Sequence, residues 1–246
     1  MATVRILATS DIHAPKYLSM LRSSLEKRSG VEEGVDLVLL AGDYVEKGRI
    51  QFLKYVLKLL ERFRGKPIIG VFGNEDYDEI RPRIREEAEF IIWLEDEEYE
   101  VSINGVKVRV YGTSGVLDKP TSWQERNIPG IKRIYEERLE GIRRFASKPS
   151  GSSEIKILLT HYPPTYKTLV GEPRYAWPQM ASSRAESIIA RTGGVDFVIH
   201  GHAHKSRVLE AVISTTKVYN VAIPARGDVL VASLEPPGAR GLLKFM

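Results

Sequence analysis

Five short apolar runs, rich in valine, isoleucine and leucine, recur along this chain and constrain its fold more than any other feature. Runs of this kind are typical of strands that are buried on both faces of a sheet. Segments with apolar residues three and four positions apart lie between some of them, at about 16–28, 48–64 and 182–192, and this spacing predicts helices. The alternation predicts an α/β fold. The runs are TVRILATS (3–10), DLVLLAG (36–42), PIIGVFG (67–73), EIKILLTH (154–161) and VDFVIHG (195–201).

Two further regions predict antiparallel pairing. YEVSI (99–103) and VKVRVYG (106–112) flank Asn104-Gly105, and this dipeptide suits the positive φ angles of a type I′ hairpin turn. Towards the end of the chain, three more strand-like segments predict an antiparallel run. We therefore expect a mixed architecture with two sheets. The three segments are RVLEAVIST (207–215), KVYNVAI (217–223) and DVLVASLE (228–235).

The domain organisation follows from the length and from the absence of repeats. The 246 residues, 43% of them hydrophobic, suffice for one substantial core. We see no internal repeat and no low-complexity tract that would separate domains. The sequence therefore predicts one domain, 1–246, with a helical insertion around 118–147 that leads into the connector SKPSGSS (147–153).

Composition excludes several classes of site. The chain has no cysteine, so disulfides, zinc–thiolate sites and cysteine nucleophiles are excluded, and nitrogen and oxygen must hold any metal. The formal charge of +4 comes from 36 basic and 32 acidic residues that are interspersed, which supports a nucleic-acid partner only weakly. No apolar stretch reaches the roughly 18 residues of a membrane span. We therefore expect no membrane association and a cytoplasmic location.

Polar side chains follow each of the five apolar runs. In open α/β sheets, ligands bind beyond the carboxyl ends of the strands. One histidine there could simply be a strand terminator bonded to the backbone, but all five histidines of the chain lie at these ends. We therefore expect the five ends to converge on one site. In chain order the candidates are Asp11 and His13, then Asp43, then Asn74, Glu75 and Asp76, then His161, and finally His200, His202 and His204.

The donor types indicate a metal. Imidazole nitrogens, carboxylate oxygens and an amide oxygen, without thiolates, suit divalent manganese, iron, zinc, cobalt or nickel. The candidate ligands are too many for one six-coordinate ion, and two ions that share a carboxylate fit better. Such a pair, about 3.5 to 4 Å apart, activates a bridging water and binds the oxygens of a phosphoryl group. The residue types thus favour a two-metal site for phosphoryl chemistry.

The order of the motifs resembles the calcineurin-like metallophosphoesterase family, and within it predicted phosphoesterases of archaeal type. The resemblance runs from residue 8 to about 205 and implies a two-sheet β-sandwich flanked by helices, in four layers α/β/β/α. The motifs Asp-x-His, Gly-Asp, Gly-Asn, His and Gly-His-x-His correspond to Asp11, His13, Gly42, Asp43, Gly73, Asn74, His161, Gly201, His202 and His204.

The resemblance also implies which ligands share an ion. One ion would bind Asp11, His13, Asp43 and His204, and we call these the first ligand group. The other would bind Asp43, Asn74, His161 and His202, the second ligand group, so that Asp43 bridges the two ions. His200 is expected to support the site without binding a metal. The three glycines of the motifs, Gly42, Gly73 and Gly201, are expected to allow sharp backbone turns.

The sequence departs from the family at position 75. Most members carry a histidine there, which is thought to protonate the leaving group or stabilise the transition state. Glu75 would be ionised beside two metal ions and would therefore donate a proton poorly. It could orient a lysine, an arginine or a water, or it could be an exposed acid near the N-terminus of a helix that begins around Asp78. A fixed negative charge beside the phosphoryl site would favour diesters over doubly charged monoesters.

The segment 162–180 follows His161 and is either a lid over the substrate or a proline-stiffened surface connection. Its side chains Tyr166, Lys167, Arg174 and Trp177 are candidates for stacking on a base or binding phosphate. Trp123 and Asn127, in the 118–130 part of the insertion, are expected near the same cleft.

The sequence favours a dinuclear metal-dependent hydrolase of phosphodiesters or phosphomonoesters, in which a metal-bridging hydroxide attacks phosphorus. Manganese is the expected metal, and a small-molecule or nucleotide phosphoester is the expected substrate. The alternatives are a non-catalytic metal-binding scaffold on the same fold and a nuclease, and a homo-oligomer is an open alternative to a monomer. The complete ligand set argues against the scaffold. The expected catalytic residues are Asp43, Asn74, Glu75 and His161.

Overall fold

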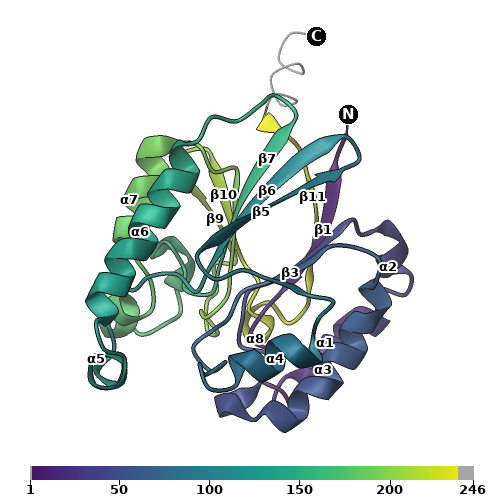
Figure 1. The fold of residues 1–246 in the computed structure, drawn as a ribbon, viewed down its shortest axis with the longest axis horizontal. Helices are drawn as coiled ribbons and strands as arrows, with labels where there is room; N and C mark the ends of the chain where they lie inside the picture. The colour runs from purple at the N-terminus through teal and green to yellow at the C-terminus, as the bar shows by residue number, and fades with distance from the viewer. Residues whose placement is uncertain (1, 238–246) are drawn as a thin grey trace.

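The computed structural model describes residues 2–237, in which two β-sheets pack face to face between two groups of helices (Figure 1). Residues 1 and 238–246, which the predicted domain 1–246 includes, lie outside the described residues. The strand order is β11-β1-β2-β3-β4 in the first sheet and β5-β6-β7-β8-β10-β9 in the second. The strands are β1 (Val4–Thr9), β2 (Leu37–Leu40), β3 (Ile68–Gly70), β4 (Ile92–Trp93), β5 (Glu97–Ile103), β6 (Val106–Thr113), β7 (Glu154–Thr160), β8 (Phe197–His200), β9 (Glu210–Ile213), β10 (Thr216–Asn220) and β11 (Leu230–Leu234).

The helices form the two outer layers. Figure 1 shows α1 to α4 beside the first sheet and α6 and α7 beside the second. Within residues 2–237, no helix is both long enough and apolar enough to cross a membrane. The α-helices are α1 (Leu18–Glu26), α2 (Val31–Gly34), α3 (Leu53–Leu60), α4 (Arg81–Glu87), α5 (Ser122–Asn127), α6 (Ile131–Ser147), α7 (Ser183–Thr192) and α8 (Ile223–Arg226). Short 3₁₀ helices are η1 (Glu46–Gly48), η2 (Ile50–Phe52), η3 (Glu61–Phe63), η4 (Lys167–Leu169) and η5 (Arg174–Gln179).

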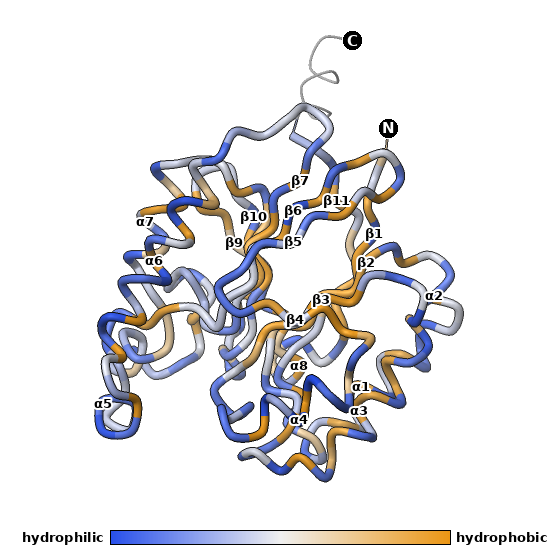
Figure 2. Tube along the Cα trace, in the orientation of Figure 1, coloured by the Kyte–Doolittle hydropathy of each residue, from blue (hydrophilic) through white to orange (hydrophobic). Residues whose placement is uncertain are grey.

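Three apolar cores separate these four layers. Successive side chains of a strand point to opposite faces, so Leu7 of β1 packs with the helices α1 and α3 while Ile6 packs between the two sheets. A third core lies between the second sheet and α6 and α7, and includes Phe145 and Ile189. In Figure 2, β2 and β3 are mostly hydrophobic, whereas the partly exposed β5 is mostly hydrophilic. This arrangement confirms the predicted α/β/β/α fold.

The five apolar runs form β1, β2, β3, β7 and β8, as the sequence predicted. β1, β2 and β3 are parallel neighbours in one sheet, and β7 and β8 are parallel neighbours in the other. The predicted hairpin is also present, because β5 and β6 pair antiparallel with Ile103 opposite Val106. Parallel neighbours place their carboxyl ends at one edge of a sheet, and these ends carry the candidate ligands.

The C-terminal strands depart from the predicted antiparallel run. β9 and β10 pair antiparallel, but β10 is parallel to β8, and β11 crosses to the first sheet, where it is antiparallel to β1. Leu230 and Leu234 of β11 join the core between the sheets. The crossing has a physical reason, since β1 is buried along most of its length and would otherwise leave an unpaired edge.

Two helical predictions need correction. The helix expected from about Asp78 begins at Arg81, and Pro82 lies in its first turn, where a proline's fixed φ is favourable. The insertion 118–147 holds two helices rather than one with a preceding loop. The added helix, α5, begins with a capping box in which Thr121 and Gln124 bond each other's backbone N–H groups.

Candidate metal centre

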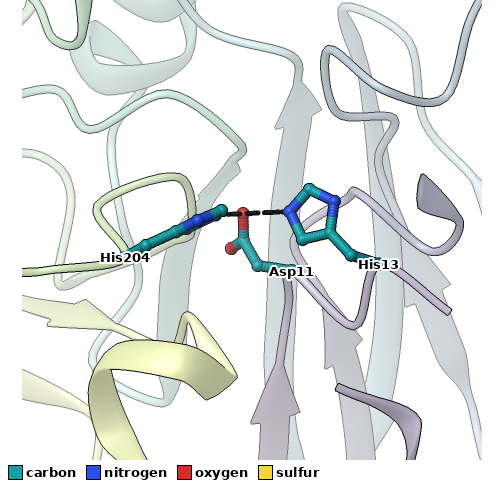
Figure 3. A group of neighbouring side chains, drawn as sticks. All are labelled: Asp11, His13 and His204. Carbon is teal, nitrogen blue, oxygen red and sulfur yellow. Dashed lines mark hydrogen bonds and ion pairs between the residues drawn. The ribbon is translucent and has the colours of Figure 1, made fainter. Parts of the chain in front are cut away.

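The predicted ligands gather where the carboxyl ends of the two sheets meet. In the first ligand group, Asp11 Oδ1 lies 2.7 Å from His204 Nε2 and 3.7 Å from His13 Nε2. The Nε2 atoms of the two histidines are 3.3 Å apart. Figure 3 shows both rings pointing at the carboxylate between them. The three side chains thus offer ligand atoms within 4.8 Å of one another, which is close enough to hold a common ion.

The second ligand group adjoins the first through Asp43. Asp43 Oδ2 lies 3.4 Å from His13 Nε2 and 3.5 Å from His161 Nε2. His161 Nε2 is also 3.0 Å from Oδ1 of Asn74, which is exposed at the rim of the site. A single carboxylate oxygen therefore faces a histidine of each group.

His202 lies beside both groups. Its ring centroid is 5.1 Å from that of His161 and 6.5 Å from that of His204. Its backbone N–H donates to Asp11 Oδ2 at 2.9 Å, and its ring meets the edge of Tyr162 at 4.9 Å. The hydroxyl of Tyr162 in turn accepts a hydrogen bond from the buried Gln124 of α5, so the insertion supports this side of the site.

The backbone at the site is strained. A positive φ is uncommon for any residue other than glycine, and such conformations cluster at functional sites. Four of the seven predicted ligands adopt one: Asp11 (56°), His13 (41°), Asp43 (57°) and His202 (68°).

The motif glycines serve two different purposes. Gly42 has a φ of 89° and makes the sharp turn that the sequence predicted. Gly73 and Gly201 do not have a positive φ, and they matter because the ligands approach them closely. A Cβ at Gly73 would lie 2.1 Å from Asp43 Oδ1, and one at Gly201 would lie 2.4 Å from Asp11 Oδ2. Both positions therefore exclude any side chain.

The buried charges fit a cation. Asp11 and Asp43 are at most 1% exposed, and within residues 2–237 neither pairs with a lysine or arginine. Burial and the charge of Asp76 raise the pKa of Asp43 well above its usual value, whereas hydrogen bonds from His13 and His204 outweigh burial and hold the pKa of Asp11 well below it. Buried carboxylates need a compensating positive charge. The mixed nitrogen and oxygen donors therefore fit divalent ions.

The pKa values of three predicted histidine ligands shift in opposite directions, so that one histidine favours its charged form and two favour the neutral form. Burial alone would lower the pKa of His13, but its bonds to Asp11 and Glu75 and the charge of Asp43 raise it to about 11. Burial lowers the pKa of His161 and, with the nearby His161, that of His202. Neutral imidazoles are the form that binds metals.

Asp76 supports the backbone around Asp43, a role that the sequence did not reveal. Its fully buried carboxylate accepts hydrogen bonds from the backbone N–H groups of Asp43 (2.7 Å), Gly73 (2.9 Å) and Tyr44 (3.0 Å). Burial raises the pKa of Asp76 to about 6 even though these bonds oppose the shift. The signal in the sequence was an acidic residue two positions after the Gly-Asn pair.

Among residues 2–237, Glu75 contacts a predicted ligand and no lysine or arginine side chain. Its Oε2 lies 3.0 Å from His13 Nδ1 and accepts the backbone N–H of Lys47 at 2.8 Å. The alternative prediction, that Glu75 is an exposed acid near a helix N-terminus, is wrong. The helix α4 begins only at Arg81 and has no acidic residue in its first turn.

His200, which is expected to support the site without binding a metal, lies at the end of β8. The residue is fully buried, with Nε2 2.9 Å from Thr168 Oγ1 and Nδ1 2.9 Å from the carbonyl oxygen of Gly201. Burial lowers its pKa to about 4. Both ring nitrogens thus have partners in the protein, and His200 connects β8 to the 162–180 segment.

Three of the four predicted substrate contacts of the 162–180 segment have protein partners. Tyr166 donates to Asp118 at 2.6 Å, Trp177 donates to the carbonyl of Glu172 at 3.0 Å, and Lys167 pairs with Glu186 at 3.3 Å. Arg174 is exposed. These contacts favour the prediction that the 162–180 segment is a proline-stiffened surface connection over the prediction that it is a lid.

The two insertion residues are also outside the ligand cluster. Trp123 is 56% exposed, and Asn127 donates its side-chain amide to the carbonyl oxygen of Trp123 at 2.8 Å. This bond lies within α5, so the structure gives no contact between these two side chains and the predicted ligands among residues 2–237.

Comparison with known proteins identifies relatives of the fold and of the sequence. The sequence model of the family described as calcineurin-like phosphoesterase matches residues 4–206. No curated protein matches the chain. Similar solved structures include the phosphopantetheinyl hydrolase of Mycobacterium tuberculosis, with 15% identity over 92% of each chain and a TM-score of 0.61.

Two other solved structures share the fold at similarly low identity. GAP50, the anchor in the inner membrane complex of Plasmodium, is 12% identical over 92% of this chain and 73% of its own, with a TM-score of 0.58. TT1561 of Thermus thermophilus is 14% identical over 94% of this chain and 98% of its own, with a TM-score of 0.55. At such identities the likeness shows the fold alone.

Proposed function

This chain belongs to the calcineurin-like phosphoesterase family, and on that basis we propose that it is a hydrolase of phosphoric esters that works with two divalent metal ions. The observation that carries the proposal is the position of Asp43. Its Oδ2 lies within 3.5 Å of Nε2 of His13 and of His161, which belong to different ligand groups. One carboxylate between two sets of nitrogen and oxygen donors is the arrangement that a pair of ions requires.

The ligands would divide as the family resemblance implies. Asp11, His13, Asp43 and His204 would hold one ion, and Asp43, Asn74, His161 and His202 the other. When bound, two such ions activate a water as nucleophile and neutralise charge on the phosphoryl oxygens. Manganese fits the mixture of carboxylate, amide and imidazole donors, and iron, zinc, cobalt and nickel are the alternatives.

The chain's own residues shape this site for a substrate. His161 donates its Nδ1–H to the carbonyl of Ala41 at 2.9 Å, which leaves Nε2 free to face Asp43 and Asn74. Asp11, Asp43 and His161 form a buried floor, whereas the side chain of His204 is 30% exposed. The phosphoryl group would therefore approach from the side of His204 and Asn74.

We propose that diesters are preferred over monoesters. Three carboxylates other than the bridge, those of Asp11, Glu75 and Asp76, lie in or behind the site. This concentration of negative charge opposes a doubly charged monoester more than a singly charged diester. The residue directly after Asn74 is Glu75 and not a histidine, so no histidine at this position can protonate a poor leaving group.

A metal-binding scaffold is the second candidate. Among the solved structures that share the fold, one is described as a hydrolase and another as an anchor, so the fold by itself does not decide between catalysis and assembly. What favours catalysis is the full set of seven predicted ligands together with the strained backbone at four of them.

The deciding experiment measures metal content and hydrolysis on the same preparation. Protein stripped with a chelator and reloaded with manganese is expected to bind two ions per chain and to hydrolyse bis-p-nitrophenyl phosphate faster than p-nitrophenyl phosphate. The stripped protein is expected to be inactive. Two bound ions without hydrolysis of either ester would favour the scaffold, and failure to bind any divalent ion would overturn the proposal.

A further inference from the structure

Glu75 lies beside the nitrogen of the His13 ring that points away from the other predicted metal ligands. The two nitrogens of the His13 ring have different surroundings. Nε2 lies 3.4 Å from Asp43 Oδ2 and 3.3 Å from His204 Nε2, inside the first ligand group. Nδ1, on the other side of the ring, lies 3.0 Å from Glu75 Oε2. The carboxylate is therefore placed to act on the ligand rather than on the substrate.

We propose that Glu75 is a positioning residue that fixes the tautomer and the orientation of His13, an inference that rests on the proposed metal-dependent function. An imidazole binds a metal through a nitrogen without a proton, and the bond made by the other nitrogen decides which nitrogen that is. Glu75 accepts the Nδ1–H of His13, so in the neutral, metal-binding form of the ring the lone pair is on Nε2, which faces Asp11 and Asp43. A carboxylate that accepts the Nδ1–H also makes the imidazole more basic, so that Nε2 binds a metal ion more strongly.

The backbone holds Glu75 for this role. The same Oε2 accepts the N–H of Lys47 at 2.8 Å, and the carbonyl of Glu75 accepts the N–H of Gly48 at 3.0 Å. The N–H of Glu75 donates to Asp43 Oδ1 at 2.8 Å. Glu75 therefore contacts two members of the first ligand group, His13 through its side chain and Asp43 through its main chain.

His161 shows the same arrangement with a different acceptor. Its Nδ1 lies 2.9 Å from the carbonyl oxygen of Ala41, so a neutral backbone group fixes its tautomer. His13 instead depends on an ionised side chain, and bonds to a charged acceptor are the stronger kind. Replacing Glu75 should therefore weaken the first metal site and leave the second unchanged.

The binding experiment compares three variants of the full chain. Manganese titrated calorimetrically into stripped Glu75→Leu is expected to show one of the two sites weakened by about 10- to 100-fold. Glu75→Gln should show a smaller loss, since its amide oxygen can still accept the Nδ1–H. Glu46→Gln is the matched control, because it removes a nearby negative charge that pairs with Arg49 (3.2 Å) and does not contact His13. Its affinities should equal those of the unaltered protein.

A spectroscopic readout tests the tautomer independently of activity. In zinc-loaded protein with ¹⁵N-labelled histidine, the His13 Nδ1–H is expected to be visible and protected from exchange with water. In Glu75→Gln it should exchange faster, and in Glu75→Leu it should be lost from the spectrum.

Three results would overturn the inference: unchanged binding in both Glu75 variants, equal weakening in Glu46→Gln, or equal loss of both ions. If Glu75→Leu does not fold, the comparison of Glu75→Gln with Glu46→Gln decides. None of these readouts depends on turnover, so the inference can fail while the proposed hydrolase function stands.

Discussion

A single carboxylate, that of Asp43, lies between histidines supplied by different sheets, and its replacement distinguishes a bridged pair of ions from two independent sites. Asp43→Asn removes the charge that would neutralise both cations, so both ions should be lost together at limiting manganese. His204→Ala removes a ligand of the first group alone and should cost one ion. Elemental analysis after gel filtration measures the difference. Retention of one ion by Asp43→Asn would contradict the bridge.

A glycine beside the bridge gives a steric test. In Gly73→Ala the new Cβ would lie 2.1 Å from Asp43 Oδ1 and 2.6 Å from its backbone nitrogen, so the strand end must move. We expect a loss of about 1–3 kcal/mol in the free energy of unfolding, measured with urea in the presence of a chelator, and loss of metal. Gly151→Ala is the control, since the nearest atom to its Cβ would be 3.7 Å away. Equal stabilities would show that this strand end is more adaptable than its contacts indicate.

At the residue scale, the sequence predicted the convergence of the candidate ligands but not the contacts that Glu75 and Asp76 make with them. Asp11, Asp43 and His161 could be identified because each follows an apolar run. Glu75 was recognised as a departure, yet its partner could not be predicted, because His13 lies 62 positions away in the chain. The backbone N–H of Lys47 holds the Glu75 carboxylate in place, and the loop that contains Lys47 has no periodic pattern from which its path could be predicted.

At the scale of elements, Asp118 connects the insertion to the 162–180 segment and to α7. Its carboxylate accepts hydrogen bonds from the hydroxyls of Tyr166 (2.6 Å) and Ser182 (2.9 Å) and from the backbone N–H of Ser183 (2.9 Å). Burial would raise the pKa of Asp118, but these bonds outweigh it and lower the pKa below the usual 3.8. The ionised form therefore stabilises the folded state.

This shift predicts a pH-dependent effect of Asp118→Asn. Because the folded pKa lies below the unfolded one, the stabilisation is present above about pH 4 and is lost as the pH falls through the folded pKa. The variant should be less stable by about 1 kcal/mol at pH 7, and the difference should shrink towards pH 3. Urea unfolding at both pH values measures it. Glu137→Gln, which affects an exposed pair with Arg133, should change little at either pH, and a pH-independent loss in Asp118→Asn would refute the charge effect.

Strand identity could be predicted from sequence, whereas strand partners could not. The buried runs and the Asn104-Gly105 turn carry local signals, and they formed the expected strands and hairpin. Nothing local indicates that β11 pairs with β1, because the paired residues Val4 and Leu234 lie at opposite ends of the described chain. Likewise, nothing local indicates that β9 takes the outer edge of the sheet, so that β10 and not β9 pairs with β8.

At the scale of the whole molecule, the predicted ligands come from both sheets. Asp11, Asp43 and Asn74 follow strands of the first sheet, and His161, His202 and His204 follow strands of the second. Hydrogen bonds already cross between the sheets here, among them those from His161 Nδ1 to the Ala41 carbonyl and from the His202 N–H to Asp11. A metal bound at this junction would hold the two halves of the sandwich together, and the unfolded chain offers no such site.

Metal binding should therefore stabilise the entire fold. A ligand that binds only the folded state adds RT ln(1 + [L]/Kd), which is about 2.7 kcal/mol per site at a free concentration of 100 Kd. For a chain of this length that corresponds to a rise in Tm of about 5 to 10 °C. Differential scanning calorimetry of stripped protein at increasing free manganese should show a single transition that moves upward with concentration. In Asp43→Asn the shift should largely disappear. If the transition instead split in two, or only a part of the heat moved with metal, the ions would be held within one sheet, and the assignment of ligands from both sheets would be wrong.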